Sequence, residues 1–225
     1  MLNLIATTHV AISTWPTNCL NVFTISYAND TETHQAALQI FTNNEQVTAD
    51  LRFPVMKMAV ESGGVQEWEA VLARFRSSDF SEEQRQCLRA LGYSRDPELL
   101  DKTLQLAISG EVRSQDISFV VASVAVNPLG RQRVWDWFKS NFDEIIRRYA
   151  GGQNFILAAV IEDCTRFWTE RAKALEIREF FATHPVPSAT RSIEQSLETI
   201  EAIANWKERD SDDVATWLAS LQAKE

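Results

Sequence analysis

The sequence predicts an all-α protein, and three observations lead to this prediction. Apolar residues recur every three or four positions over most of the chain after residue 30, which is the spacing of one helix face. The 225 residues include only seven glycines and six prolines, too few for a turn-dense β protein. Hydrophobic residues make up 45% of the chain, enough to bury a sizeable core. We therefore expect a globular protein built from helices and short turns.

The first 30 residues differ from the rest of the chain. Residues 23–27 alternate apolar and polar side chains as a strand does, and Pro16 opposes a helix before them. We therefore predict an atypical N-terminal segment at residues 1–30 and a helical domain at residues 31–225.

Helix start and stop signals organise the first half of this domain. Ser62-Gly63-Gly64 ends a helix in which Pro54 must lie in the first turn. Ser81-Glu82-Glu83-Gln84 has the pattern of a capping box, and Asp96-Pro97-Glu98 combines an N-cap with a first-turn proline. The apolar stripes of these helices comprise Ala37, Leu38 and Phe41; Leu51, Val55, Met58 and Ala59; Trp68, Val71, Leu72 and Phe75; Cys87, Leu88 and Leu91; and Leu99, Leu100, Leu104, Ala107 and Ile108.

Residues 117–126 are rich in β-branched and aromatic side chains, so propensity alone favours a strand. Ser114 can cap a helix at this point, and the neighbouring segments are helical. We therefore predict a buried helix over residues 117–126.

The clearest helix signal runs from Leu129 to Gly152. Pro128 fits a first helical turn, and Gly151 and Gly152 fit a helix end. The stripe expected to be buried consists of Val134, Phe138, Phe142, Ile145 and Tyr149.

Four further helices are predicted after this one. Pro185 and Pro187 separate the second of them from the third. Trp206 or Trp217 is expected to pack beneath a neighbouring helix. The four predicted helices span residues 155–164, 170–183, 188–209 and 211–221. The spacing of all the expected helices is near that of the two-helix units of HEAT and armadillo arrays, which predicts a superhelical or bundle-like stack of antiparallel helix pairs with one concave side.

Charge and cysteine usage restrict the partners and the compartment. The chain has 22 Lys and Arg against 31 Asp and Glu, a net charge of −9, which argues against nucleic acid or an anionic membrane as a partner. Cys19, Cys87 and Cys164 lie far apart without a CxxC spacing, which indicates free thiols in a reducing compartment. The N-terminus lacks the basic region of a signal peptide, so we expect a cytoplasmic protein.

No catalytic or metal-binding motif stands out. HExxH, GxSxG and GxxxxGK do not occur, and the histidines lack the spacing of metal ligands. Cys87 and Cys164 are expected to be inert core thiols, and His184 is expected to close a helix. The acidic groups Glu82-Glu83, Glu162-Asp163 and Asp210-Asp212-Asp213 are interpreted as structural, the last of them at a helix start.

Several phrases between residues 32 and 221 resemble the C-terminal helical domain of puromycin-sensitive and endoplasmic-reticulum-type zinc aminopeptidases. In combination they are specific, although no single phrase is. They are Val112-Arg113-Ser114-Gln115-Asp116; Gly130-Arg131 with Trp135 and Phe138; Asn141-Phe142-Asp143-Glu144; Arg148-Tyr149-Ala150-Gly151-Gly152; Phe180-Phe181 before His184-Pro185-Val186-Pro187; Arg191-Ser192-Ile193-Glu194-Gln195; and Asn205-Trp206-Lys207-Glu208-Arg209-Asp210.

The resemblance implies a non-catalytic, HEAT-like domain that arches over a thermolysin-like catalytic domain. Such a domain encloses the peptide substrate and aids size selection during N-terminal trimming. The family's GAMEN and HExxH motifs do not occur in this sequence, so we expect zinc only in the catalytic domain and no cofactor in this chain. The implied partners are a peptide and that catalytic domain.

The resemblance also implies where a peptide would be held. In the antigen-trimming members a basic residue just after an Ala-Leu-x turn helps to engage the peptide's C-terminus. Here Ala90-Leu91-Gly92 is followed by Tyr93, with Arg95 two positions later. Arg95 and Arg113 are therefore the candidate peptide contacts. The alternative function is a stand-alone HEAT-like module that binds a protein or a peptide.

Overall fold

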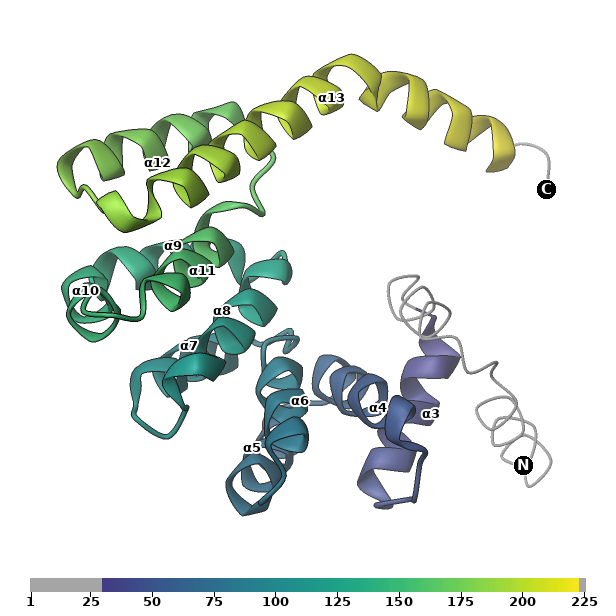
Figure 1. Ribbon diagram of the computed structural model, residues 1–225. Coiled ribbons are helices and arrows are strands. Elements are labelled where there is room, and N and C mark those ends of the chain that lie inside the picture. Colours follow the sequence, from purple (N-terminus) through teal and green to yellow (C-terminus); the bar gives the residue numbers. More distant parts are fainter. Residues whose placement is uncertain (1–29, 223–225) are drawn as a thin grey trace. The chain divides into compact units, whose positions relative to one another are not determined.

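The computed structural model describes residues 30–222, and every regular element within that range is a helix. The all-α prediction is therefore confirmed for the described residues. The strand expected at residues 23–27 lies outside them. The chain divides into two compact units, residues 1–130 and residues 131–225, and each is described by itself (Figure 1).

Unit 1 is built from successive pairs of helices. Helix α3 packs on α4, α5 on α6 and α7 on α8, while α4 also contacts α6, and α6 contacts α8. The unit therefore has two layers: α3, α5 and α7 form one, and α4, α6 and α8 form the other. Its elements are α3 (Thr31–Thr42), α4 (Ala49–Ser62), α5 (Val65–Ser77), α6 (Ser81–Leu91), α7 (Pro97–Ile108), the 3-10 turn η1 (Ser114–Asp116) and α8 (Ile117–Val126). This pairing of helices is compatible with the expected stack, and HEAT-like repeats and superhelical stacking stay predictions.

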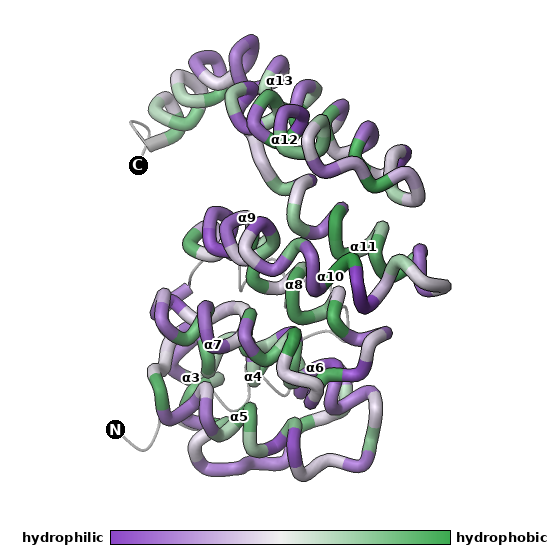
Figure 2. Tube along the Cα trace, turned by 90° about the vertical axis from the view of Figure 1, so that its left-hand side faces the viewer, coloured by the Kyte–Doolittle hydropathy of each residue, from purple (hydrophilic) through white to green (hydrophobic). Residues whose placement is uncertain are grey.

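Helix α8 is the buried helix that the sequence predicts, despite its β-branched composition. Ile117, Val120, Val121 and Val124 are fully buried against α6 and α7, and Figure 2 shows hydrophobic residues along most of the helix. Burial on several sides outweighs the small helix penalty of β-branched side chains. Ser114 does not cap α8, because it lies in η1.

A turn after α8 holds the connection between α6 and α7 in place. The side-chain amide of Asn127 donates to the carbonyl oxygens of Gly92 at 3.1 Å and Ser94 at 2.8 Å. The Gly130 N–H donates to the Asn127 carbonyl, which closes a turn around Pro128. The sequence suggested that Pro128 lies in the first turn of the next helix. It belongs instead to this turn.

Two further expectations for helix starts in unit 1 are wrong. Pro54 lies five residues after Ala49, the first residue of α4, and so beyond the first turn. Proline leaves the carbonyl of Asp50 without its helical donor, but Asp50 is exposed and water can reach that carbonyl.

The second wrong expectation is the capping box at Ser81. The N-cap of α6 is Phe80, and no side chain caps it. The start of the helix is instead held by Ser78, whose hydroxyl donates to Glu83 at 2.6 Å and accepts from the Phe80 N–H. The amide of Gln84 donates to the Ser78 carbonyl oxygen at 2.8 Å. The serine that holds the helix start is therefore Ser78, three residues before Ser81, and its side-chain partners Glu83 and Gln84 belong to the expected box.

Unit 2 is arranged around α11, which contacts α9, α10, α13 and the 3-10 turn η2, while α12 packs on α13. Leu157, Val160 and Ile161 of α11 are fully buried. The elements of this unit are α9 (Arg131–Ser140), α10 (Phe142–Tyr149), α11 (Asn154–Thr165), α12 (Arg171–Thr183), η2 (Pro187–Ala189) and α13 (Thr190–Gln222). Helices α11 and α12 match the predicted ranges, and His184 closes α12 as expected, its N–H donating to the Phe180 carbonyl.

The single helix expected over residues 129–152 is two helices, α9 and α10, separated at Asn141. The Asn141 side chain donates to the Trp137 carbonyl at 2.7 Å, and its backbone N–H donates to the same carbonyl. A side chain that competes for a helical carbonyl in this way favours a break. Most of the predicted stripe is buried, with Val134, Phe138, Ile145 and Tyr149 at most 2% exposed, while Phe142 is half-buried.

Helix α13 is also different from expectation, because it is continuous where two helices were predicted. The segment Asp210-Ser211-Asp212-Asp213 lies within it and does not start a helix. No glycine or proline occurs in α13, and the propensity cost of aspartate and serine is only a few tenths of a kcal/mol per residue. Trp206 and Trp217 are 53% and 59% exposed, so neither packs beneath a neighbouring helix in unit 2.

Candidate functional site

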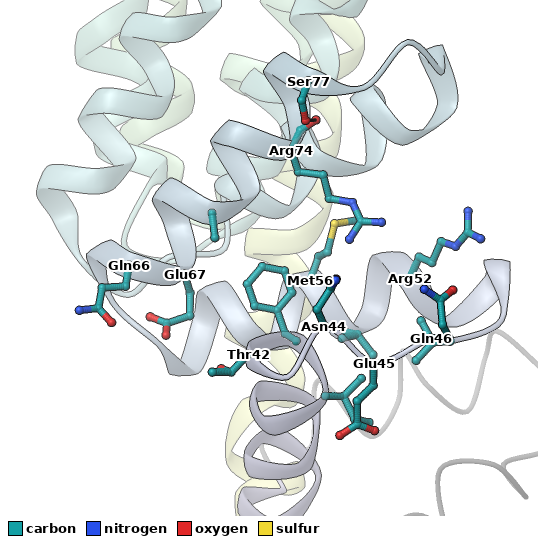
Figure 3. A pocket seen from close by; sticks show the side chains of 15 residues that line it. Thr42, Asn44, Glu45, Gln46, Arg52, Met56, Gln66, Glu67, Arg74 and Ser77 are labelled. Carbon is teal, nitrogen blue, oxygen red and sulfur yellow. Dashed lines mark hydrogen bonds between the residues drawn. The ribbon is translucent and has the colours of Figure 1, made fainter.

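A surface pocket of about 650 Å³ lies in unit 1, between the end of α3, α4 and α5 (Figure 3). Apolar side chains, including those of Met56 and Val55, form part of its wall, and both residues are buried. Polar side chains surround the remainder. The residues that line the pocket are Ile40, Phe41, Thr42, Asn44, Glu45, Gln46, Val47, Arg52, Val55, Met56, Gln66, Glu67, Ala70, Arg74 and Ser77.

The loop between α3 and α4 shapes one wall of this pocket. Asn44 has a positive φ of 51°, a left-handed conformation that asparagine tolerates better than most residues. The N–H groups of Asn44 and Glu45 donate to the carbonyls of Phe41 and Ile40, which turns the chain sharply at the end of α3. This turn places Asn44, Glu45 and Gln46 at the pocket.

Two arginines make one side of the pocket basic, opposite Gln66 and Glu67 in Figure 3. Arg74 Nε donates to Glu83 Oε1 at 2.7 Å. Hydrogen bonds from the Ser78 hydroxyl and from Arg74 lower the pKa of Glu83. Arg52 is exposed and has no ion-pair partner within residues 30–222.

On the opposite side of the pocket, Glu67 stabilises the start of α5. Glu67 Oε2 accepts a 2.8 Å hydrogen bond from the Gly64 N–H at the start of α5. A carboxylate at a helix N-terminus is stabilised there by the free N–H groups. Glu67 is therefore engaged at the helix start. The carboxylate of Glu45 also lines the pocket, and the guanidinium of Arg52 has no ion-pair partner among the described residues.

A guanidinium beside an apolar wall can bind a carboxylate that carries an apolar neighbour, such as the C-terminus of a peptide. The residues that line the pocket include neither histidine nor cysteine. The nearest thiol, Cys87, donates to the Met56 sulfur at 3.8 Å and is fully buried. Burial raises the pKa of Cys87 to about 12, so the thiol is not an activated nucleophile. The exposed guanidinium beside an apolar wall makes the pocket suited to binding.

Arg95, a predicted peptide contact, lies outside this pocket and takes part in a charged cluster around Glu61. Arg95 Nη2 is 3.5 Å from Glu61 Oε1, while Lys57 Nζ and His34 Nε2 are 3.1 Å and 3.4 Å from Glu61 Oε2. Lys57 is only 3% exposed and lies 4.5 Å from the centre of the Tyr93 ring. Burial lowers the pKa of Lys57, although Glu61 opposes this shift. Arg95 itself is 54% exposed.

Arg113, the other predicted contact, also lies outside the pocket. It pairs with Asp116, its Nε donating at 2.6 Å, and its Nη1 donates to the Ser81 hydroxyl at 2.9 Å. The ion pair joins Arg113 to the buried Asp116 of η1, and the hydrogen bond to Ser81 ties the residue before η1 to the start of α6. The structure therefore brings neither Arg95 nor Arg113 to the pocket.

The three acidic groups are engaged with nearby arginines, which agrees with a structural role. Glu82 pairs with Arg85, Glu162 and Asp163 pair with Arg166, and Asp210 pairs with Arg209. No group of three or more possible metal ligands is present among the described residues. Cys164 is buried, and burial raises its pKa well above the ordinary value, as expected for an inert thiol.

No sequence pattern points to Arg52 or Arg74 as site residues. Both residues are polar positions of amphipathic helices, where an arginine ordinarily only faces solvent. The one available signal was the polar run Asn43 to Gln46, which is long enough to hold two helices apart. Their convergence depends on the packing of α5 beside α4.

No helix in the described part of the chain is long and apolar enough to cross a membrane.

Comparison with known proteins places the chain in a family. Residues 18–202 match the model of the ERAP1-like C-terminal domain. Aminopeptidase 2, mitochondrial, of Saccharomyces cerevisiae is 32% identical over 196 residues, which cover 85% of this chain and 20% of the relative. Aminopeptidase N of Mus musculus is 29% identical over 78% of this chain and 18% of its own length. Aminopeptidase M1 of Arabidopsis thaliana is 30% identical over 69% and 18%.

The chain thus spans about a fifth of the length of these curated relatives. The matched region extends over most of the two described units, from the segment before α3 into α13. The chain belongs to the ERAP1-like C-terminal domain family.

Proposed function

We propose that this chain is the non-catalytic, peptide-enclosing domain of a zinc aminopeptidase. The observation that carries the proposal is the family match over residues 18–202, together with relatives that are named aminopeptidases. In this role the chain would cover a catalytic domain, contribute to peptide binding and help to select peptides by size. Zinc would be bound by the catalytic domain.

Within this function, the α3–α5 pocket binds the carboxylate end of a peptide. Arg52 supplies the charge, and the half-buried apolar lining residues Phe41 and Val47 contact the last side chain. The exposed guanidiniums of Arg95 and Arg113 are secondary peptide contacts, as the family resemblance implies. Each of them already has a carboxylate partner, so we expect their contribution to be smaller than that of Arg52.

The proposal is tested first by metal content and activity. The purified chain is expected to contain no stoichiometric zinc and to leave aminoacyl-amide substrates intact. Added to the catalytic fragment of a related aminopeptidase, it is expected to bind and to change the rates of short and long peptides unequally. Stoichiometric zinc with turnover by the chain alone would contradict the proposal.

The pocket is tested by peptide binding to the full chain. A fluorescent peptide with a free C-terminal carboxylate should bind more tightly than the same peptide with a C-terminal amide. Arg52→Ala should remove most of this difference, roughly tenfold in Kd, because a charge-assisted hydrogen bond is worth about 1.5–3 kcal/mol. Arg85→Ala, which removes an arginine paired with Glu82 outside the pocket, is the matched control. Equal binding of the two peptides would exclude a carboxylate site at Arg52.

The alternative, a stand-alone HEAT-like interaction module, predicts a different outcome. The chain would then fail to bind an aminopeptidase catalytic fragment in a pull-down and would hold another protein stably. We propose the cytoplasm as the compartment, because Cys87 and Cys164 are free buried thiols.

A further inference from the structure

The start of α3 is held against α4 by one buried histidine, His34, which is 5% exposed. Among the described elements, α3 packs extensively only on α4. Besides His34, the side chains that α3 buries are those of Ala36, Ala37 and Ile40. Two of these are single methyl groups, so they bury little apolar surface. The attachment of α3 therefore depends on its polar contacts more than that of a helix with large buried side chains.

Both ring nitrogens of His34 face oxygen atoms that accept hydrogen bonds. Nδ1 lies 2.9 Å from the carbonyl oxygen of Asp30, and Nε2 lies 3.4 Å from Oε2 of Glu61 in α4. A neutral imidazole carries one N–H, so either tautomer would point a lone pair at one of these oxygens. The protonated ring has two N–H groups and donates to both. The geometry therefore favours a positively charged His34.

Two carboxylates and two cations lie around this ring among the described residues. Asp30 caps the start of α3, and Glu61 faces the ring from α4. Lys57 Nζ is 3.1 Å from the same Glu61 oxygen, and Arg95 Nη2 is 3.5 Å from the other one. The carboxylates favour a charged ring, and the cations oppose it. Because these opposing charges are equal in number, the two hydrogen bonds decide the protonation state of His34.

Loss of this proton would weaken the hold on α3 and leave the rest of the cluster in place. Glu61 would keep Lys57, which lies one turn away in α4, and Arg95 in the connection between α6 and α7. The ring of Tyr93, 4.5 Å from Lys57 Nζ, also holds that lysine. Glu61 would therefore not become an unpaired charge, and the loss falls on the contact between His34 and α4.

The other end of α3 belongs to the α3–α5 pocket. Ile40, Phe41 and Thr42 line the pocket, and the loop that follows supplies residues 44–47. Segments of a native protein open and close as cooperative units, so a weaker contact at one end of a short helix raises the open population of the whole helix. The protonation of His34 is in this way connected to a wall of the pocket.

We propose that His34 is a pH-sensitive clasp that sets how firmly α3, and with it one wall of the α3–α5 pocket, is held on α4. The protonated ring donates to Glu61 and closes the clasp. The folded contacts favour this charged form, so its stabilisation is present at low pH and is lost as the pH rises through the range in which histidine ordinarily titrates. The inference concerns the wall of the pocket and not its ligand, so it does not rest on the proposed function.

Hydrogen exchange of the full chain tests the clasp at about pH 5.5 and about pH 8.5, on either side of the ordinary histidine range. Exchange is expressed as protection factors, which removes the effect of pH on the intrinsic rate. Protection of residues 31–42 is expected to be at least about fivefold lower at the higher pH, because a charge-assisted hydrogen bond is lost. Protection of α7 and α11 should change much less. Equal protection of residues 31–42 at the two pH values, or higher protection at the higher pH, would overturn the proposal.

Two variants assign the effect to one histidine. His34→Gln keeps a hydrogen-bonding side chain without the charge, and it should make the protection of residues 31–42 independent of pH. His184→Gln is the matched control, because His184 is exposed and stacks on Phe180 at the end of α12. This control should leave the pH dependence of α3 intact. A pH dependence that persists in His34→Gln, or that His184→Gln also removes, would overturn the proposal.

A second measurement addresses the pairing with Glu61. Glu61→Gln removes the charge of the acceptor and should also abolish the pH dependence of α3. In urea unfolding, a double-mutant cycle of His34→Gln and Glu61→Gln should show a coupling at about pH 5.5 that disappears at about pH 8.5. A coupling of the same size at both pH values would contradict a clasp that opens when His34 loses its proton.

Discussion

The indole Nε1 of Trp135 donates a hydrogen bond of 2.5 Å to Oε1 of Glu176 and so connects α9 with α12. Trp135 is fully buried, and its ring lies 5.3 Å from that of Phe180 in an edge-to-face contact. Lys139 and Lys173 also contact the Glu176 carboxylate, at 3.2 Å and 2.5 Å. Burial raises the pKa of Glu176, but the hydrogen bonds from Lys173, Trp135 and Lys139 outweigh it and lower the pKa to about 2.

The first prediction concerns acid stability. A carboxyl group whose pKa is depressed in the folded state stabilises the protein fully above its unfolded pKa of about 4.3, and this stability is lost as the pH falls toward 2. Glu176→Gln should therefore lower the free energy of unfolding at pH 6. At pH 3 the same substitution should lower it by a smaller amount. Urea unfolding between these pH values measures the difference. Glu179→Gln, on the same helix and exposed, is the control. A pH-independent effect of Glu176→Gln would contradict the ionic role of Glu176.

The second prediction concerns Gly130. A Cβ added at Gly130 would lie 2.1 Å from the Val124 carbonyl oxygen, which is backbone and cannot move aside cheaply. Gly130→Ala should therefore destabilise the protein by about 1–3 kcal/mol, as overpacking usually does.

Gly151→Ala is the matched control, because an added Cβ meets nothing within 4 Å there. It should be neutral or stabilise by about 0.4–1 kcal/mol through the unfolded state. Thermal unfolding of both variants measures these effects. Similar melting temperatures would contradict the prediction that a Cβ at position 130 is too close to the Val124 carbonyl oxygen.

The third prediction concerns thiol reactivity. Cys87 and Cys164 are 0% and 3% exposed, and burial raises the pKa of each. In the native protein both should react with a disulfide reagent at least about 100-fold more slowly than in urea, because reaction requires exposure and a thiolate. Peptide mapping after timed alkylation distinguishes the individual cysteines. Native and unfolded rates of similar size at either residue would contradict its burial.

The fourth prediction concerns the continuity of α13. Ser211→Pro removes a helical N–H and introduces a steric clash, which costs about 3 kcal/mol in a helix interior. Amide exchange should become faster near residue 211, while the melting temperature of unit 2 changes little, because this part of α13 is exposed. Ser211→Ala should not accelerate exchange. If α13 were two helices meeting at residue 211, proline would fit a first turn and exchange would not change.

The helical segments that sequence patterns located correctly are those with strong local signals. Asp96 and Pro97 start α7 as expected, since the Asp96 carboxylate accepts from the Glu98 N–H at 2.8 Å. Gly63 and Gly64 separate α4 from α5. In these places two or three adjacent residues carry the whole cause of the boundary, so no distant contact is needed to predict it.

The errors occur where a local signal competes with packing or with another hydrogen bond. The Asn141 side chain shares the Trp137 carbonyl with its own backbone N–H, and Asn141, at φ −113° and ψ 15°, divides a helix that the apolar stripe alone would continue. Pro54 is accepted inside α4 because Phe53, Val55 and Met56 around it are buried in the core of unit 1. Neither outcome can be predicted from periodicity. Periodicity shows which face of a helix is apolar, but it does not show which backbone carbonyl a side chain bonds to.

The candidate site depends on tertiary packing even more than these helix boundaries do. Arg52 and Arg74 are separated by 22 positions in the sequence and belong to different helices, so no motif joins them.

The sequence by itself determined the all-α class, most of the buried stripes and the helix boundaries at Gly63-Gly64 and Asp96-Pro97. These features depend on residues within one or two helical turns of each other, where the chain's own geometry specifies the neighbours. Only the tertiary structure decided that Arg52 and Arg74 share a pocket and that His34 of α3 faces Glu61 of α4. Both depend on how one helix lies against another, and that is set by the packing of side chains far apart in the chain.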